Sequence, residues 1–144
     1  MCNVTVTFPV TPKPKLRPRF KCKYNQVITF TPLETKIFEN QIKDYYGYVA
    51  KGYCFEKGTP LSIDLIFGMP IPASESKKRK ADMIAGLLLP TKKPDLDNLT
   101  KSVLDALNGV AWHDDAQIVT LHVTKQYVTD PYIKLTIHGL YTRG

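Results

Sequence analysis

The run PDLDNLTKSVLDALNGVAWHDDAQIVTLHV, residues 94–123, decides the fold because its apolar residues change their spacing halfway along. The first half predicts a helix over about residues 98–108, ended by Gly109. One face of this helix carries an apolar stripe of Leu99, Val103, Ala106, Leu107 and Val110. In the second half, Val119, Leu121 and Val123 recur at every second position, the period of a strand. We therefore expect the helix to pack its stripe against a sheet that contains the strand.

Alternation of period two predicts further strands on both sides of this run. They cover residues 3–8, 26–30, 61–67 and 133–137. A turn at residues 129–131 separates the last two strands of the chain. This order of strands and helices predicts an α+β fold with a mixed β-sheet and helices packed against it. The length of 144 residues favours one compact domain that spans residues 1–144.

Two further helices are indicated by their boundary residues. Thr31 is a predicted N-cap, with Pro32 at the first helical position and Glu34 at the capping-box spacing. The helix that begins there is predicted to have an apolar stripe of Phe38, Ile42, Tyr45 and Val49. A polar stretch bracketed by prolines, residues 69–94, is too long for an ordinary loop, and we expect a short helix over residues 76–85 within it. We interpret this stretch as a basic insertion in the domain.

Composition excludes several classes of protein. A hydrophobic fraction of 43% with 23% charged residues is typical of a globular chain. No apolar run approaches the roughly 18 residues of a membrane span, and the N-terminus lacks a secretory signal, so we expect a cytoplasmic protein. Three widely spaced cysteines, Cys2, Cys22 and Cys54, predict free thiols.

The net charge of +7 is concentrated in three short segments. Twelve of the 20 basic residues lie there: Lys13, Lys15, Arg17, Arg19, Lys21 and Lys23; Lys77, Lys78, Arg79 and Lys80; Lys92 and Lys93. These residues predict a polyanionic partner, since cations placed against phosphates release counterions. In an extended chain the six basic residues within 13–23 share one face, which suits a DNA backbone or a solvated sheet edge. The second segment suits DNA contact or a solvated helix face.

Aspartates gather on either side of the helix over residues 98–108. Asp95 and Asp97 lie two positions apart before it, and Asp114 and Asp115 precede the next strand. If that strand runs beside the start of the helix, Asp115 can meet Asp95 and Asp97, and the repelling carboxylates need a cation. Carboxylates favour Mg²⁺ or Mn²⁺ over zinc, and such ions activate water for phosphodiester hydrolysis. The alternative is that Asp97 is only an N-cap and Asp95 only favours the helix dipole.

Other side chains have two interpretations each. Lys101, one turn after Asp97, suits the orientation of water or the neutralisation of phosphate, but also an ion pair with Asp105. Aromatic residues, among them Tyr24 and Trp112, could stack on unpaired bases, although such residues more often belong to a core.

The motifs within residues 94–127 resemble the signature of the RusA family of Holliday junction resolvases. Four elements match in order and spacing: Asp-x-Asp-Asn, a lysine four residues after the second aspartate, Asp-Ala-Leu, and an aromatic residue followed by x-Asp-Asp-x-Gln. The resemblance is weaker over the first ninety residues. The basic insertion is longer than in short members of the family.

This resemblance implies catalytic, metal-binding aspartates at Asp95, Asp97 and Asp115 and a functional lysine at Lys101. We expect supporting roles for Asn98, Asp105 and Asp114. It also implies a homodimer with two active sites, dependence on Mg²⁺, no small-molecule cofactor, and paired symmetric nicks in branched DNA such as a four-way junction. Two alternatives are a non-catalytic basic DNA-binding protein and a metal-dependent nuclease that acts on other nucleic acid structures.

Overall fold

The computed structural model describes residues 2–140, so the ends of the predicted domain, Met1 and residues 141–144, lie outside the described residues. Its elements in chain order are β1 (Asn3–Phe8), β2 (Arg19–Lys23), β3 (Gln26–Phe30), α1 (Leu33–Val49), β4 (Leu61–Pro70), α2 (Lys77–Ile84), α3 (Leu96–Leu107), the 3₁₀ turn η1 (Asp115–Gln117), β5 (Ile118–Val128) and β6 (Tyr132–Gly139).

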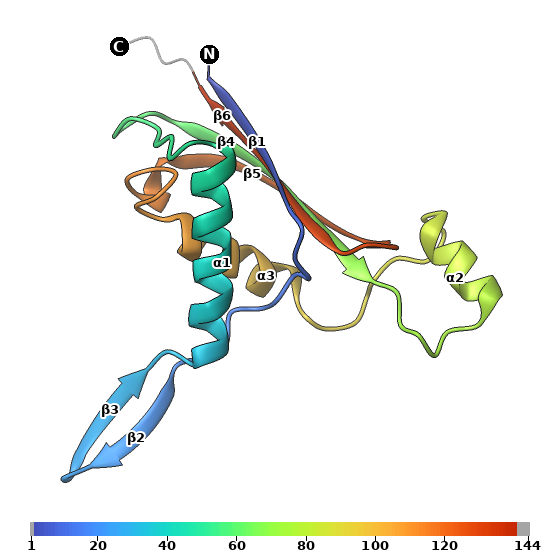
Figure 1. Ribbon diagram of the computed structural model, residues 1–144, viewed down its shortest axis with the longest axis horizontal. Helices are drawn as coiled ribbons and strands as arrows, with labels where there is room; N and C mark the ends of the chain where they lie inside the picture. Colours follow the sequence, from blue (N-terminus) through green and yellow to red (C-terminus); the bar gives the residue numbers. More distant parts are fainter. Residues whose placement is uncertain (1, 141–144) are drawn as a thin grey trace.

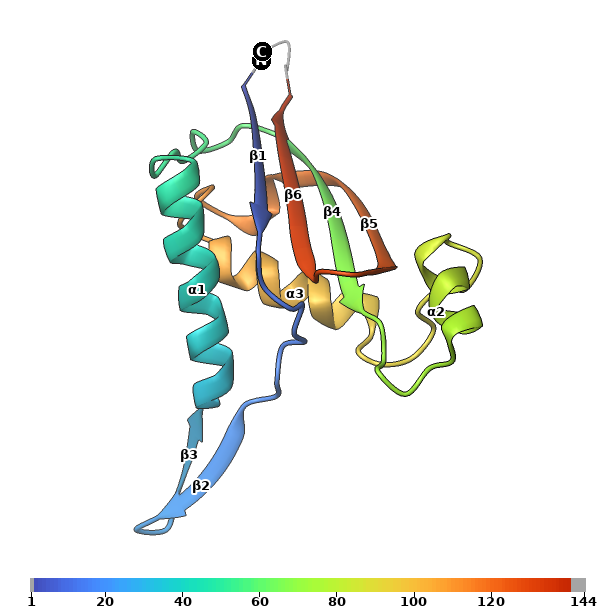
Figure 2. The same cartoon turned by 45° about the vertical axis from the view of Figure 1, so that its right-hand side comes forward.

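Four strands form a mixed sheet in the order β1-β6-β4-β5 (Figure 1). Strand β4 pairs parallel with β5 and antiparallel with β6, and β6 pairs antiparallel with β1. Helices α1 and α3 pack against each other on one face of this sheet (Figure 2). The predicted α+β class and mixed sheet are confirmed. The turn at residues 129–131 does not make β5 and β6 neighbours, because β4 lies between them.

The core lies between the helices and one face of the sheet. Alternate residues of β4 are buried there, as their period predicts. The helices contribute Phe38, Ile42 and Tyr46 from α1 and Leu99, Val103, Ala106 and Leu107 from α3. Each large apolar side chain buried in this way contributes about 1.5–3 kcal/mol to folding. This packing fixes the position of α3, whose first turn carries the acidic motif.

Helix α1 differs from its prediction at both ends. It begins at Leu33 because Pro32 has the extended ψ of 144° and serves as the N-cap, without a side-chain capping bond. The predicted capping role of Thr31 is therefore wrong. The fully buried stripe continues from Phe38 and Ile42 to Tyr46, since these three residues repeat every four positions, and the predicted Tyr45 is half-buried and packs against the same core. Val49 is exposed.

Helix α2 confirms the prediction of a short helix in the basic insertion. The hydroxyl of Ser76 accepts a hydrogen bond from the backbone N–H of Arg79 at 3.2 Å, which is an N-cap. Figure 2 shows α2 beside the end of β5, away from the other two helices.

Strands β2 and β3 form a hairpin that projects from the domain (Figure 1). Strand β3 was predicted and β2 was not. Their turn consists of Tyr24 and Asn25, both with positive φ, as the two-residue turns of twisted hairpins require. The register places Arg19, Lys21 and Lys23 on one face, so the predicted alternation of basic residues is present in this part of the segment.

The start of β5 contains a β-bulge. Ile118 pairs with Leu61 and Thr120 with Ser62, so Val119 has no partner in β4 and is exposed. The prediction that Val119, Leu121 and Val123 share one regular strand face is wrong at Val119, because the bulge inserts one residue. Leu121 and Val123 face the helices, since they pair with buried residues of β4.

None of the helices within residues 2–140 is long and apolar enough to cross a membrane. Cys2, Cys22 and Cys54 are free thiols, as predicted.

Candidate active site

The first turn of α3 presents two aspartates. Asp95 is the N-cap residue, with an extended ψ of 147°, and Asp97 is the second residue of the helix. The interpretation of Asp97 as the N-cap is therefore wrong, since the structure gives that position to Asp95. The Asp95 carboxylate makes no capping hydrogen bond. Asp97 Oδ1 accepts only the backbone N–H of Asn98 at 2.9 Å among the hydrogen bonds described within residues 2–140. Both exposed carboxylates are available to a ligand.

The loop after α3 holds Asp115 rigidly. Trp112 is fully buried, and its Nε1 donates a hydrogen bond to Asp115 Oδ1 at 2.7 Å. The side chain of Asp114 caps the 3₁₀ turn by accepting from the backbone N–H of Ala116. The buried Gln117 accepts from the N–H groups of His113 and Asp114. These bonds fix the backbone on both sides of Asp115.

Gln117 also ties this loop to the rest of the domain. Its Nε2 donates to the carbonyl oxygens of Glu56 and Thr59 at 2.9 and 3.1 Å. The loop therefore keeps its place relative to β4, although the two segments lie far apart in sequence.

The environment of Asp115 opposes its ionisation. Burial raises the pKa of Asp115, the negative charges of Asp105 and Asp114 raise it further, and the hydrogen bond from Trp112 offsets part of this effect. A cation bound at this carboxylate would relieve both the desolvation and the repulsion.

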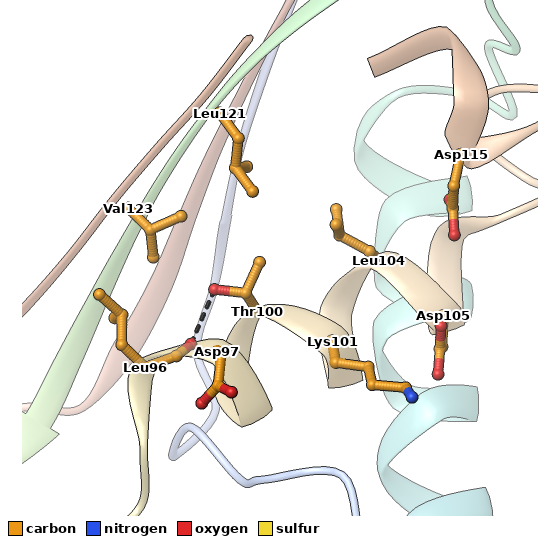
Figure 3. Close-up of a pocket in the computed structure, with 9 residues that line it drawn as sticks. All are labelled: Leu96, Asp97, Thr100, Lys101, Leu104, Asp105, Asp115, Leu121 and Val123. Carbon is orange, nitrogen blue, oxygen red and sulfur yellow. Dashed lines mark hydrogen bonds between the residues drawn. The ribbon is translucent and has the colours of Figure 1, made fainter. Parts of the chain in front are cut away.

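A hollow of about 560 Å³ brings these elements together between α3 and β5 (Figure 3). It is lined by Leu96, Asp97, Thr100, Lys101, Leu104, Asp105, Asp115, Leu121 and Val123. Asp97, Lys101 and Asp115, predicted from three separate positions of the motif, thus face one cavity. Asp95 does not line it and lies exposed at the start of α3. The remaining lining is mostly aliphatic.

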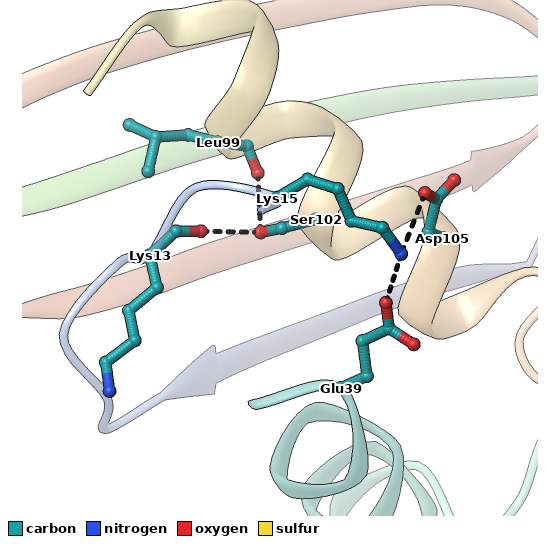
Figure 4. Close-up of polar contacts among 6 residues, drawn as sticks. All are labelled: Lys13, Lys15, Glu39, Leu99, Ser102 and Asp105. Carbon is teal, nitrogen blue, oxygen red and sulfur yellow. Dashed lines mark hydrogen bonds and ion pairs between the residues drawn. The ribbon is translucent and has the colours of Figure 1, made fainter. Parts of the chain in front are cut away.

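Asp105 forms an ion pair with Lys15, not with Lys101. Lys15 Nζ lies 3.3 Å from Asp105 Oδ2 and also forms an ion pair with Glu39 (Figure 4). Burial lowers the pKa of Lys15, but the hydrogen bonds and charges of the two carboxylates outweigh it, and the pKa lies above its ordinary value. The ion pair between Lys101 and Asp105, one of the two interpretations of Lys101, is not formed, and Lys101 has no ion pair among residues 2–140. Lys101 is free to act in the hollow.

The same contact changes the interpretation of one basic segment. Lys15 connects the segment before the hairpin to α1 and α3, where its ammonium is paired with two carboxylates, an arrangement that stabilises the fold. The Ser102 hydroxyl supports this connection, since it donates to the carbonyl oxygen of Lys13 at 2.7 Å (Figure 4). Arg79 is likewise paired, with Glu75 at 2.7 Å, although it remains exposed.

The carboxylate oxygens suit a hard divalent cation by their chemistry. Within residues 2–140, however, no group of three Asp, Glu, His or Cys side chains lies close enough together to hold a metal ion as it stands. Asp97 and Asp115 share the hollow, and the third predicted ligand, Asp95, lies outside it.

Two residues that organise the site were not predicted in these roles. The interpretation of Trp112 as a base-stacking residue is wrong, because the side chain has no exposed surface. Gln117 was identified only as the last residue of the motif, with no role in the site. The spacing of Trp112, Asp115 and Gln117 was the signal for both roles. An indole N–H three residues before an aspartate can bond its carboxylate, and an amide two residues after it can bond the backbone of the same turn.

The chain matches known proteins over most of its length. The family model described as endodeoxyribonuclease RusA matches residues 9–138. A protein of Bacillus subtilis (strain 168), described as uncharacterized protein YqaN, is 38% identical over 125 residues, which cover 84% of this chain and 85% of that protein.

Proposed function

Because the chain belongs to the RusA family and is therefore an endodeoxyribonuclease that resolves Holliday junctions, we propose that it acts as a Mg²⁺-dependent homodimer. Each of its two active sites makes one of two symmetric nicks in a four-way junction. Members of this family depend on divalent metal ions, and Mn²⁺ is the expected substitute for Mg²⁺. The family rules out a purely DNA-binding, non-catalytic protein.

The observation that carries this proposal is the common hollow of Asp97, Lys101 and Asp115. Asp97 and Asp115 would hold the ion, together with Asp95, whose carboxylate makes no capping hydrogen bond. At these carboxylates a divalent ion would supply an activated water and neutralise charge on the phosphodiester. Lys101 approaches the phosphate, while Trp112 keeps one oxygen of Asp115 oriented.

Supporting residues act on the carboxylates and their backbone. Asp114 caps the turn that contains Asp115, and Asp105 raises the local negative charge. The backbone N–H of Asn98 orients Asp97.

Basic residues outside the hollow are proposed to contact the DNA backbone. They are Lys13, Arg17, Arg19, Lys21, Lys23, Lys77, Lys78, Arg79, Lys80, Lys92 and Lys93. The hairpin and α2 lie on opposite sides of α3 (Figure 2), so we expect phosphates to be attracted beside the hollow and to reach it when a cation is bound.

The experiment compares a synthetic four-way junction with a linear duplex and single strands of matched sequence, in Mg²⁺ or EDTA. Nicks mapped at symmetric positions of the junction, only in Mg²⁺, are expected. Equal cutting of duplex and junction would contradict junction selectivity, and cutting of single strands alone would favour a nuclease for other structures.

Asp97→Asn tests the role of the carboxylates. The variant is expected to bind the junction and lose cutting by about 100-fold or more. Asp44→Asn, on the exposed side of α1, is the matched control and should cut like the wild type. Undiminished cutting by Asp97→Asn would reject the proposed metal site.

A further inference from the structure

The tip of the hairpin β2–β3 carries a residue that its backbone disfavours. Tyr24 and Asn25 form the two-residue turn, with φ of 52° and 59°. Positive φ at both positions favours Asn, Asp or Gly, and a bulky side chain is rare there. Asn25 suits this turn, whereas Tyr24 strains it and adds no buried contact, since it is 88% exposed. A tyrosine at this position therefore indicates a role outside the packing of the domain.

The hairpin stands apart from the core and reaches far from it. Every residue of β2 and β3 is exposed, and the hairpin extends beyond the first turn of α1, away from the sheet (Figure 1 and Figure 2). Strands of five residues carry the tip about 17 Å outward, at about 3.4 Å per residue. This reach is about twice the depth of the major groove of DNA. The tip can therefore reach nucleobases while the start of the hairpin stays at the phosphates.

Charge decides which partner this hairpin suits. Residues 19–30 include Arg19, Lys21 and Lys23 but no Asp or Glu. The three cations share one face, and none of them forms an ion pair within residues 2–140. A row of unpaired cations that ends in an exposed aromatic ring matches a nucleic acid strand whose nucleobases are open to stacking. Of the two interpretations of Tyr24, the core residue is thus wrong, and the stacking residue agrees with its surroundings.

Lys23 adds a cation directly at the ring. Its Nζ lies 5.5 Å from the centroid of the Tyr24 ring, a cation–π contact. A nucleotide that stacks on this ring would bring its phosphate near the same ammonium. The tip thus combines a surface for one nucleobase with a charge for its backbone.

Nucleobases offer a free face only where stacking is interrupted. Within a duplex each base is covered by its neighbours, and a side chain that enters between two base pairs must first unstack them. At the branch point of a four-way junction the stack is already interrupted, so a ring can cover a base at a lower cost. A stacking residue therefore distinguishes a junction from a duplex, which phosphate contacts alone do not.

We propose that Tyr24 stacks on an unstacked nucleobase at the branch point of the DNA junction, while the cations of the hairpin bind the flanking phosphates. This inference rests on the proposed function and names the residue by which the site selects branched DNA. The cations of the hairpin bind duplex and junction alike, and the ring adds affinity only for the junction.

Tyr24→Asn is the decisive variant because Asn is favoured at positive φ. The substitution removes the ring and keeps the turn, so a loss of binding is not due to an unfolded hairpin. In EDTA, the affinity of the full-length variant for a four-way junction should fall about fivefold or more, the effect of one lost stacking contact. Its affinity for a duplex of matched sequence should be unchanged. An unchanged ratio of junction affinity to duplex affinity would overturn the proposal.

Two further variants separate the ring from other effects. Tyr24→Phe keeps the ring and should bind both DNAs like the wild type. Tyr48→Asn, which removes a tyrosine that is 82% exposed on α1, is the matched control and should also bind like the wild type. A Tyr24→Asn variant that sediments as a smaller assembly than the wild type would place the tip against a second copy of the chain and overturn the proposal.

Photocrosslinking locates the ring on the DNA. Junctions carry 5-iodouracil either at the branch point or in the middle of one arm, and the wild-type complexes are irradiated in EDTA. Peptide mapping should find Tyr24 joined to the label at the branch point. A crosslink of Tyr24 to the arm alone would place the tip in a groove and overturn the proposal, as would a branch-point label joined only to other residues.

The outcomes separate the stacking contact from the activity, because binding and crosslinking in EDTA require no cleavage. A protein that crosslinks through Tyr24 at the branch point but cuts no DNA in Mg²⁺ would leave this inference standing and reject the proposed function. A protein that nicks junctions selectively with Tyr24→Asn as well as with Tyr24 would reject the inference and keep the nuclease. A protein that binds no junction would reject both.

Discussion

The indole Nε1 of Trp112 donates a 2.7 Å hydrogen bond to Oδ1 of Asp115. A fully buried ring thereby fixes a half-buried carboxylate at the wall of the hollow, on the side opposite the first turn of α3 (Figure 3). Mutation of a group that orients a metal-binding side chain typically costs about 10- to 100-fold in metal affinity or activity.

Replacing Trp112 by Phe should therefore reduce Mg²⁺-dependent junction cutting by about tenfold or more, because the carboxylate loses its donor. Junction binding in EDTA should be unchanged. The apparent Mg²⁺ requirement, measured by titrating the ion in the cleavage assay, should rise.

Phe8→Leu is the control for this variant, since it also removes buried aromatic volume but lies on β1, which two strands separate from β5 in the sheet. It should lower the melting temperature and leave the Mg²⁺ requirement unaltered. If the Trp112→Phe variant and the wild type require the same Mg²⁺ concentration, Trp112 does not position Asp115.

Lys15→Met should destabilise the domain. Its ammonium lies between Glu39 and Asp105, whose side chains are largely buried, so its removal leaves two carboxylates unpaired. The expected loss is about 1–2 kcal/mol in the free energy of unfolding, between the values for exposed and for buried pairs. Urea unfolding measures it, and Lys13→Met, on an exposed neighbour, should change stability by less than about 0.5 kcal/mol.

The hairpin should contribute to DNA affinity through charge. Replacing Lys21 and Lys23 by Gln removes two cations from one face and should reduce the slope of log affinity against log salt by about 1–2. Binding in EDTA at several salt concentrations gives this slope. The matched control replaces Lys51 and Lys57, at the other end of α1, by Gln and should keep the slope of the wild type. Equal slopes for the two variants would exclude contacts between the hairpin and DNA.

Alkaline pH should weaken the fold through Tyr46. Burial raises the pKa of Tyr46 to about 12 from an ordinary value near 10, and its hydroxyl donates to the Tyr53 carbonyl at 2.6 Å. Because the folded pKa is the higher one, this contribution to stability is complete below about pH 10 and is lost as pH rises toward 12.

Tyr46→Phe isolates this effect. Below pH 10 the variant should be less stable by about 1 kcal/mol, the contribution of one hydrogen bond. The difference from the wild type should narrow between pH 10 and 12 in thermal unfolding measurements. A stability difference between the two proteins that stays constant from pH 10 to 12 would contradict a raised pKa of Tyr46.

Local patterns were sufficient for much of the fold. The apolar stripe of Leu99, Val103 and Leu107 predicted α3 because a helix exposes one face every 3.6 residues, and Gly109 ends it at the predicted position with a positive φ. Ser76 likewise starts α2 as its sequence predicts. Strand β2 was missed because four prolines precede it and its basic residues gave no apolar signal; its pairing with β3 supplies the missing stability.

The candidate site divides in the same way. The sequence by itself determined the candidate groups for the chemistry, since Asp97, Lys101 and Asp115 stand in a motif whose spacing is specific. Only the tertiary structure decided their neighbours: Asp97 and Asp115 meet through the packing of α3 beside β5, Asp95 stays outside the hollow, and Asp105 pairs with Lys15 from ninety residues earlier. The physical reason is that spacing along a chain fixes contacts within a helix or strand, whereas contacts between elements depend on how their buried faces pack.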